Sequence, residues 1–494
     1  MHSFDAILFT DTAAYPDWTR GYGAHRLASH LRTHGYTVLV IDFSIALTFK
    51  TWQEICKYAV GENTIFLGFS TTWWPYRNPD QDNPFINPVV NLADNVSESF
   101  KKPQPEEKTL TYDAANGTAH RWIEEAKKYS PNIKTLIGGA KIDWYLDFPA
   151  DYFFSGFSET QISDFLKDND RIWPRVIQHD THADHNRWDW LHSSTRYTDL
   201  DNLNSGEVLT LETSRGCKFK CSFCSFPLIG QKKVADYVKT EETIYNELLE
   251  NYDKWGITNY WIADDTFNDS TEKLEMLHRI NKKLPFQLQY RAYLRLDVLA
   301  MHQEQIGLLY ESGLKNCWFG IETFHEKAAR AIGKGMPEAK RKQALYEAQK
   351  VWGNEVAVAS GYIVGLPHED ADHVWKQAEW FMEDNNPVNH NPNFMPLIIN
   401  PPGAYAHHPM SDIDRNPEKY GYKIPDMNRF NFWTKDDNTG VDSFETAWKI
   451  CAEITNAIQS KGNKITNDLV YDRGIKDPQT QYFEPLIRKL KNEF

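Results

Sequence analysis

The stretch Glu212-Thr213-Ser214-Arg215-Gly216-Cys217-Lys218-Phe219-Lys220-Cys221-Ser222-Phe223-Cys224 places three cysteines at C-x3-C-x2-C spacing, directly after an apolar run at 208–211. Three thiolates from one short loop can hold three corners of a [4Fe–4S] cluster and leave the fourth iron without a protein ligand. An open metal position is where chemistry, rather than structural support, usually takes place. The spacing therefore predicts a reactive iron–sulfur centre whose ligands are Cys217, Cys221 and Cys224.

Two other uses of closely spaced cysteines fit this stretch less well. A C-x2-C pair is also typical of zinc and redox sites, and neighbouring cysteines in secreted proteins are usually disulfide-bonded. No histidine or fourth cysteine near the three completes a zinc site. The remaining cysteines, Cys56, Cys317 and Cys451, are scattered along the chain and fit small core residues.

Composition indicates a large soluble protein of a reducing compartment. The chain has 494 residues, of which 41% are hydrophobic and 25% charged, so we expect about two to four domains. Six cysteines, no signal-peptide pattern at the N-terminus and no apolar run of about 18 residues predict a cytoplasmic protein without a membrane span. The formal charge of −14 disfavours a large nucleic-acid partner.

The first third of the chain has the alternating pattern of a doubly wound α/β domain, which we place at 1–165. Strands alternating with helices imply a parallel sheet, and such sheets bind ligands at the carboxyl ends of their strands. The expected strands are 6–10, 37–42, 64–70, 134–139 and 152–154, and the expected helices are 21–33, 51–60 and 118–129.

Two polar segments interrupt this pattern. Residues 75–115 are predicted to be an insertion or lid, and residues 166–205 a linker to the next domain. The linker contains His179, His182 and His185 at regular spacing. Without a helix or strand to hold them, these histidines are better explained as part of a polar linker than as a metal site.

After the cysteine loop the α/β pattern restarts, with six strand-plus-helix units over 206–400. Polar residues follow several of the expected strands: Asp264 and Asp265 follow the second, Arg295 the third and Glu322 the fourth. Taken singly, each carboxylate fits a helix cap or an ion pair. Their repetition at corresponding strand ends favours a functional site.

The cysteine spacing, with the aromatic Phe223 before the last cysteine, resembles the signature of the radical S-adenosylmethionine (radical SAM) superfamily. The resemblance implies an incomplete (β/α)6 barrel at 206–400, with catalytic groups at the carboxyl ends of its strands. Residues 361–367 match the family pattern G-x-I-x-G-x-P.

The resemblance also implies roles for individual residues. The carboxylates of Asp264 and Asp265 would receive the methionine ammonium of SAM or orient the substrate. Arg295 would bind the SAM carboxylate or ribose region, and Glu322 the ribose hydroxyls. Phe223, Gly361 and Gly365 would lie near the adenine.

The order of strands and glycine-containing turns in the first domain resembles that of the cobalamin-binding domain that precedes many radical SAM domains. The resemblance assigns to the cobalamin side Ser70, Trp73, Trp74, Gly138 and Gly139. The family's D-x-H-x-x-G motif, whose histidine ligates cobalt, is absent, since Asp11-Thr12-Ala13 follows the first strand. Trp73 and Trp74 fit ordinary packing equally well.

These resemblances predict a radical SAM enzyme that cleaves SAM to a 5′-deoxyadenosyl radical and transfers a methyl group through cobalamin to an unactivated carbon. A radical rearrangement, cyclisation or oxidation, with or without cobalamin, is the alternative. A non-catalytic iron–sulfur or corrinoid-binding protein is a third hypothesis, disfavoured by the polar residues at the strand ends. The expected partners are a small-molecule or peptide substrate and an electron donor of the flavodoxin or ferredoxin type. Residues 401–494 match no known pattern, and we expect an α-rich cap on the substrate side.

Overall fold

The computed structural model describes residues 3–10, 13–14, 17–18, 20–71, 119–139, 142–146, 148–168, 171–178, 189–225, 237–390, 392–400, 407, 410–425, 432–461, 475 and 477–492. The chain divides into two compact units. The first comprises Met1–Leu209, Asn246–Ile257 and Arg473–Phe494, and the second Thr210–Tyr245 and Thr258–Asp472. Within the described residues, no helix combines the length and apolar character needed to cross a bilayer.

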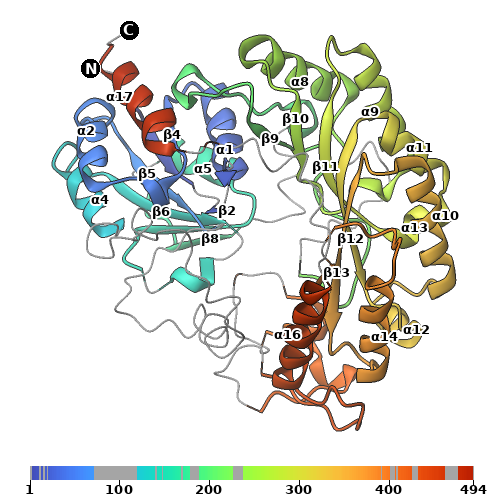
Figure 1. Ribbon diagram of the computed structural model, residues 1–494. Helices are drawn as coiled ribbons and strands as arrows, with labels where there is room; N and C mark the ends of the chain where they lie inside the picture. Colours follow the sequence, from blue (N-terminus) through green and yellow to red (C-terminus); the bar gives the residue numbers. More distant parts are fainter. Residues whose placement is uncertain are drawn as a thin grey trace. The chain divides into compact units, whose positions relative to one another are not determined.

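The first unit is built on a sheet of parallel strands in the order β4-β1-β5-β6-β7-β8 (Figure 1). The strands are β1 Ala6–Phe9, β4 Val38–Ile41, β5 Phe66–Ser70, β6 Lys134–Gly139, β7 Tyr152–Ser155 and β8 Val176–Gln178. The helices that alternate with them are α1 Tyr22–Thr33, α2 Phe49–Ala59, α4 Ala119–Lys127 and α5 Glu159–Lys167. Every residue of β1 and β4 is buried, as expected for strands with helices on both faces.

This strand order confirms the predicted doubly wound fold. The chain runs from β1 to β4 on one side and then returns to β5 on the other side of β1. The order of strands therefore reverses between β1 and β5, and sheets of this kind bind their ligands at that point. A short antiparallel pair, β2 Ala13–Ala14 and β3 Asp17–Trp18, follows β1.

Two segments that the sequence assigned elsewhere belong to the first unit. The expected linker at 166–205 contains β8, which pairs with β7 and extends the sheet. The helix α17, Glu484–Leu490, places Leu486 and Leu490 in the same apolar core as Ile7 and Trp52. The core of this unit therefore combines both ends of the chain.

The second unit is an open sheet of six strands in sequential order, β9 to β14. The strands are β9 Val208–Leu211, β10 Asn259–Ile262, β11 Gln289–Leu294, β12 Leu314–Glu322, β13 Ala357–Val364 and β14 Pro392–Pro396. The pairings from β10 to β14 are parallel. Since β9 and β14 are the two edges of the sheet, it forms the partial barrel that the sequence predicts.

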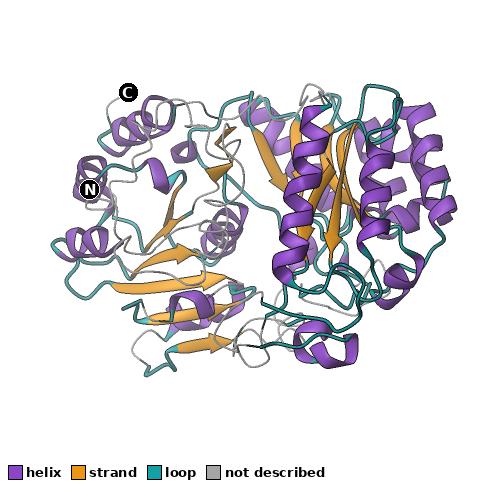
Figure 2. Ribbon diagram, turned by 60° about the horizontal axis from the view of Figure 1, so that its bottom comes forward, coloured by secondary structure: helices purple, strands orange, loops and turns teal. Residues whose placement is uncertain are grey.

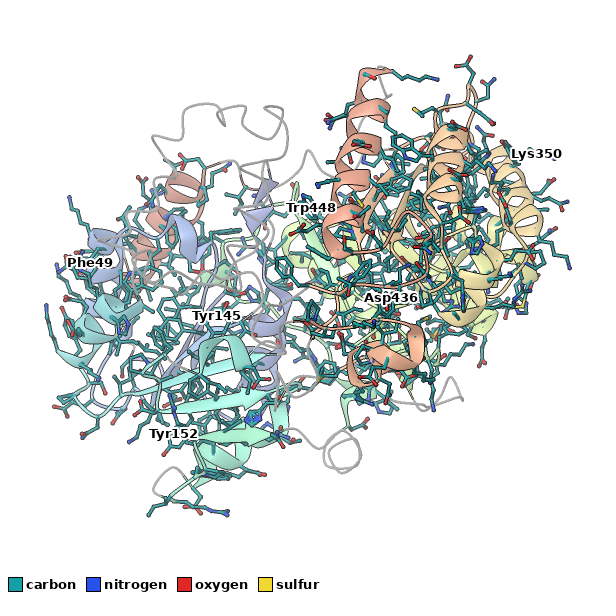
Figure 3. All side chains as sticks on the ribbon, turned by 90° about the horizontal axis from the view of Figure 1, so that it is seen from below. Phe49, Tyr145, Tyr152, Lys350, Asp436 and Trp448 are labelled. Carbon is teal, nitrogen blue, oxygen red and sulfur yellow. The ribbon has the colours of Figure 1, made fainter. Side chains whose placement is uncertain are left out.

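The helices of this unit lie along the outer side of its strands (Figures 1 and 2). They are α9 Thr271–Lys283, α10 Leu296–Met301, α11 Glu304–Glu311, α12 Glu326–Ala331, α13 Glu338–Trp352 and α14 Ala371–Phe381. The preceding helix, α8 Glu241–Trp255, is divided between the units and belongs to the first from Asn246 onward. Lys350 on α13 points outward, away from the sheet (Figure 3). The side chain of Asp370 caps the N-terminus of α14 by accepting a hydrogen bond from the His373 N–H at 2.7 Å.

The C-terminal region does not form one cap. After the short helix α15, Asp412–Arg415, the helix α16, Phe444–Ser460, packs beside α14 against β13 and β14. It thus continues the helical layer of the partial barrel, whereas α17 belongs to the first unit. The sequence predicts an α-rich cap for this region and does not indicate which of the two cores each helix joins.

Candidate functional site

The cysteine loop leaves the carboxyl end of β9, and contacts with the helical layer hold it. Cys217, Cys221 and Cys224 are half-buried, and none of them forms a disulfide. The Ser222 N–H donates to the Ile332 carbonyl at the end of α12 at 3.3 Å, and its hydroxyl donates to Ala331 at 3.2 Å. The other three cysteines are buried, and burial raises the pKa of each of those thiols. The loop thiols are therefore set apart by their exposure.

Asp264 fixes the start of this loop. It is fully buried and accepts hydrogen bonds from the Thr213 N–H at 2.8 Å, the Ser214 N–H at 2.9 Å and both hydroxyls of these residues. The Lys273 ammonium lies 3.2 Å from it and 2.8 Å from Asp269. Because its oxygens are already engaged, Asp264 positions the loop and is not available to a ligand.

Asp265 has the opposite environment. It is half-buried, and none of the described side chains donates a hydrogen bond to it. Burial, and next the neighbouring Asp264 carboxylate, raise the pKa of Asp265 to about 6. Burial, and to a lesser degree the Asp265 carboxylate, raise the pKa of the Cys217 thiol. An unpaired carboxylate beside the loop can accept a cation such as an ammonium group.

Arg295 contacts the cysteine loop directly. Its Nη1 donates to the Cys221 Sγ at 3.0 Å, and its guanidinium lies 3.9 Å from the Phe219 ring centroid. Its Nε and Nη2 donate to the two Asp297 oxygens at 3.0 and 2.6 Å, and Nη2 also donates to the Gly333 carbonyl. Four of the five N–H donors are thus used, which leaves one and not the pair that a bidentate carboxylate contact needs. Arg295 thus lies at the predicted site, but its guanidinium donates to the Cys221 sulfur and is not left available for the SAM carboxylate.

Glu322 closes β12 with a positive φ of 65°. Its Oε1 lies 3.0 Å from the Lys334 ammonium, which also donates to the Gly320 carbonyl. Lys334 is buried and lies 5.8 Å from the Phe223 ring centroid. Sequence reasoning missed Lys334, although its place between Gly333 and Gly335 was a signal that backbone and side chain meet closely there.

Two glycines, one within β13 and one directly after it, lie close to tryptophan side chains, and the second position requires glycine. A Cβ on Gly361 would lie 3.0 Å from the Trp318 Nε1, and one on Gly365, whose φ is +96°, would lie 2.5 Å from the Trp433 ring. The turn after β13 is held by Glu369, whose Oε2 accepts from the Gly365 N–H at 2.9 Å. Burial raises the pKa of Glu369 to about 7. Glu369 is a second residue that sequence reasoning missed.

The strand ends of the first unit form a separate candidate site. Ser70 pairs in register with Gly138, and the Thr71 N–H donates to the Gly138 carbonyl at 2.8 Å. Gly139 has a φ of +132°, and a Cβ there would lie 2.3 Å from the Thr71 Oγ1. Bare backbone at the end of β6 suits close approach of a ligand. The predicted Trp73, Trp74, His179, His182 and His185 lie outside the described residues.

The first unit also contains a buried polar cluster. The His25 Nε2 lies 2.8 Å from the Asp42 Oδ2, and the His25 Nδ1 lies 3.8 Å from Asp201. The Arg20 guanidinium lies 2.8 Å from the same Asp42 oxygen and 2.6 Å from Glu207. Because a guanidinium already faces Asp42, we assign this cluster to joining α1, the end of β4 and the segment 199–207, and not to a metal.

Residues 211–381 match the Radical SAM superfamily. This part of the partial barrel is therefore similar to the radical SAM superfamily. The match begins at the end of β9 and ends with α14, so it contains the cysteine loop and the strand ends that carry Asp265, Arg295, Glu322 and Gly365.

Two curated relatives share part of the chain. An uncharacterised methyltransferase of Pyrococcus horikoshii is 26% identical over 174 residues, which are 35% of this chain and 36% of that protein. The cytidylyl-2-hydroxyethylphosphonate methyltransferase of Streptomyces wedmorensis is 27% identical over 160 residues, 32% of this chain and 28% of that protein. The chain thus spans about a third of the length of these relatives.

Solved structures share the fold over both units. The radical SAM methyltransferase TsrM from Kitasatospora setae, with cobalamin and a [4Fe–4S] cluster bound, covers 100% of both chains with a TM-score of 0.59 at 14% identity. The cobalamin-dependent radical SAM enzyme OxsB, with aqua-cobalamin and SAM bound, covers 95% of this chain and 64% of its own, with a TM-score of 0.50 at 12% identity. At these identities the likeness establishes the arrangement of the fold: a doubly wound domain followed by a partial barrel.

Proposed function

We propose that the protein is a cobalamin-dependent radical SAM methyltransferase that acts on a small-molecule or peptide substrate. The observation that carries the proposal is the set of three half-buried cysteines, none of them in a disulfide, at the carboxyl end of β9 in the part of the chain that matches the Radical SAM superfamily. Both named curated relatives are methyltransferases, which supports the reaction class.

The three thiols fit a [4Fe–4S] cluster. Two of them have a hydrogen-bond partner at sulfur: the Thr266 hydroxyl, which can donate to a thiolate, lies 3.4 Å from the Cys217 Sγ, and Arg295 donates to the Cys221 Sγ. Such donors suit sulfurs that carry the negative charge of thiolate ligands. When bound, the cluster and SAM supply reductive cleavage of the sulfonium, and cobalamin carries a methyl group.

The chain's own residues would bind and orient SAM. Asp265 would accept the ammonium group, and Glu322, held by Lys334, would accept the ribose hydroxyls. Phe223 and the backbone at Gly361 and Gly365 would lie near the adenine. A one-electron donor of the flavodoxin or ferredoxin type and a small-molecule or peptide substrate complete the proposal.

Cobalamin would bind at the carboxyl ends of the strands of the first unit. The residues that fit are those around the bare turn after β6, namely Ser70, Gly138 and Gly139, together with Trp73 and Trp74. The close approach of Thr71 to Gly139 supports this assignment, because a side chain at 139 would occupy the strand end.

The cluster is tested by anaerobic reconstitution of the full chain, followed by iron and sulfide analysis and the charge-transfer absorption of the cluster. We expect four irons per chain in the wild type and loss of the cluster in Cys221→Ala. Cys317→Ala, which removes a buried thiol of the same unit, is the matched control and should retain the cluster. A folded wild-type protein that binds no iron–sulfur cluster and forms no 5′-deoxyadenosine from SAM would refute the proposal.

The methyl transfer is tested separately. We expect the protein to bind hydroxocobalamin at micromolar concentration, with a shift in its visible spectrum. A second candidate is a radical rearrangement, cyclisation or oxidation without methyl transfer, which the absence of a D-x-H-x-x-G motif after the first strand favours. A protein that forms 5′-deoxyadenosine but binds no cobalamin would support that candidate instead.

A further inference from the structure

Arg295 is a charged residue in direct contact with a cysteine of the loop. The guanidinium is buried at 4% exposure, and its Nη1 lies 3.0 Å from the Cys221 Sγ. The ring of Phe219, two residues before Cys221, lies 3.9 Å from the guanidinium carbon. Both contacts come from the cysteine loop, so Arg295 is positioned toward the loop rather than toward solvent.

Three further contacts hold the guanidinium in this orientation. Two come from the bidentate pair with Asp297, and the third from the Gly333 carbonyl at 3.2 Å. A planar guanidinium fixed at two of its edges presents its remaining edge in one direction. That edge carries the donor to Cys221.

From this geometry we propose that Arg295 is a positioning residue that raises the reduction potential of the cluster by donating a hydrogen bond to its ligand Cys221. The inference rests on the proposed function, because it requires Cys221 to ligate iron. One-electron reduction adds a negative charge that spreads over the cluster and its sulfurs. A charged N–H donor on one sulfur stabilises that charge more than the oxidised state.

Asp297 limits how far Arg295 raises the reduction potential of the cluster. Its carboxylate lies 2.6 Å from the Arg295 Nη2 and offsets much of the guanidinium charge that the cluster would feel. Removing Arg295 should therefore lower the potential, whereas removing the charge of Asp297 should raise it. Cys217 offers a contrast, since its Thr266 hydroxyl is neutral and lies at 3.4 Å.

The test is an EPR-monitored redox titration of the reconstituted full chain with dithionite, without SAM. We expect Arg295→Gln to change the ratio of reduced to oxidised cluster at least tenfold, which is about 59 mV toward lower potential for a one-electron couple. Asp297→Asn should shift the potential in the opposite direction. Arg330→Gln, which alters an exposed arginine of the same unit, is the matched control and should titrate as the wild type does.

Opposite shifts in the two variants would separate an electrostatic role from a structural one, because loss of packing would disturb both in the same direction. If the cluster of Arg295→Gln has the same reduction potential as that of the control variant, the inference is wrong while the cluster assignment stands. If Arg295→Gln assembles no cluster, Asp297→Asn decides, and an unchanged or lower potential in that variant overturns the inference. A wild type without any cluster would overturn the proposed function itself.

Discussion

Asp264 and Asp265 are adjacent in the sequence but have different roles, one in holding the cysteine loop and the other in the proposed binding of SAM. Asp264 holds the backbone of Thr213 and Ser214, and it shares the buried Lys273 with Asp269. Asp264→Asn would turn an amide N–H₂ toward groups that donate, and it would leave Lys273 with one carboxylate. We expect a loss of about 3 kcal/mol in the free energy of unfolding, measured by urea denaturation of the cluster-free chain.

Asp265→Asn is the control for that measurement. Asp265 has no hydrogen-bond partner among the described side chains, and its ionised form is opposed by burial and by Asp264. Its replacement should not lower the free energy of unfolding, because it removes a charge that burial and Asp264 oppose, yet it should weaken SAM binding. Equal losses of stability in the two variants would contradict the different roles assigned to them.

Glu369 makes the stability of the barrel depend on pH. Its pKa is raised by burial from 4.5 to about 7, so between these values the folded chain keeps a proton that the unfolded chain has lost. The free energy of unfolding should therefore fall as pH rises through this window, by about 3 kcal/mol from this group. Denaturation between pH 5 and 8 measures the slope. Glu369→Gln should flatten it, and a slope unchanged in that variant would contradict the assignment.

Helix α17 shows how an element at one end of the chain completes a core formed by the other. Leu486 is fully buried in the core of the first unit, whereas Arg488 on the same helix is exposed. Leu486→Ala should cost about 2–4 kcal/mol through lost burial and a cavity, and Arg488→Ala less than about 0.5 kcal/mol. Thermal unfolding of the two variants compares these costs, and similar melting temperatures would argue against a structural role for α17.

Sequence patterns predicted the positions of helices and strands better than they predicted which residues those helices and strands pack against. The apolar runs at 64–70 and 134–139 gave β5 and β6 to within two residues, because buried parallel strands are apolar throughout. The strand β8 was missed since it has three residues, of which one is buried. Which core α17 joins depends on contacts with residues more than 400 positions away in the sequence. One such contact is the hydrogen bond from the hydroxyl of Tyr482, just before α17, to the Val40 carbonyl.

At the candidate site of the second unit, the sequence predicted which residues follow the strands but not the hydrogen bonds that those residues make. The three cysteines and Asp265 were found from spacing and from their place after strands. That Asp264 and Arg295 are engaged by the loop itself depends on hydrogen bonds that no spacing reveals. Lys334 and Glu369 were missed because each lies several residues beyond the strand whose end it holds.

At the scale of the whole molecule, the two candidate cofactor sites belong to different compact units. The cysteine loop lies in the unit that contains Thr210–Tyr245, and Gly139 lies in the unit that contains Met1–Leu209. Each unit has its own sheet, so loss of one cofactor should leave the site for the other intact.

We therefore expect Cys221→Ala to bind hydroxocobalamin with a Kd within about twofold of the wild type, although it holds no cluster. Gly139→Val should show the reverse. Its side chain would meet the Thr71 hydroxyl at a φ that β-branched residues avoid, so cobalamin binding should weaken at least about tenfold while iron and sulfide content stay unchanged. Gly23→Ala is the matched control, because a Cβ at Gly23 meets no atom within 4 Å. Spectroscopic cobalamin titration and iron analysis of the same preparations measure both sites, and loss of both cofactors in either variant would contradict their independence.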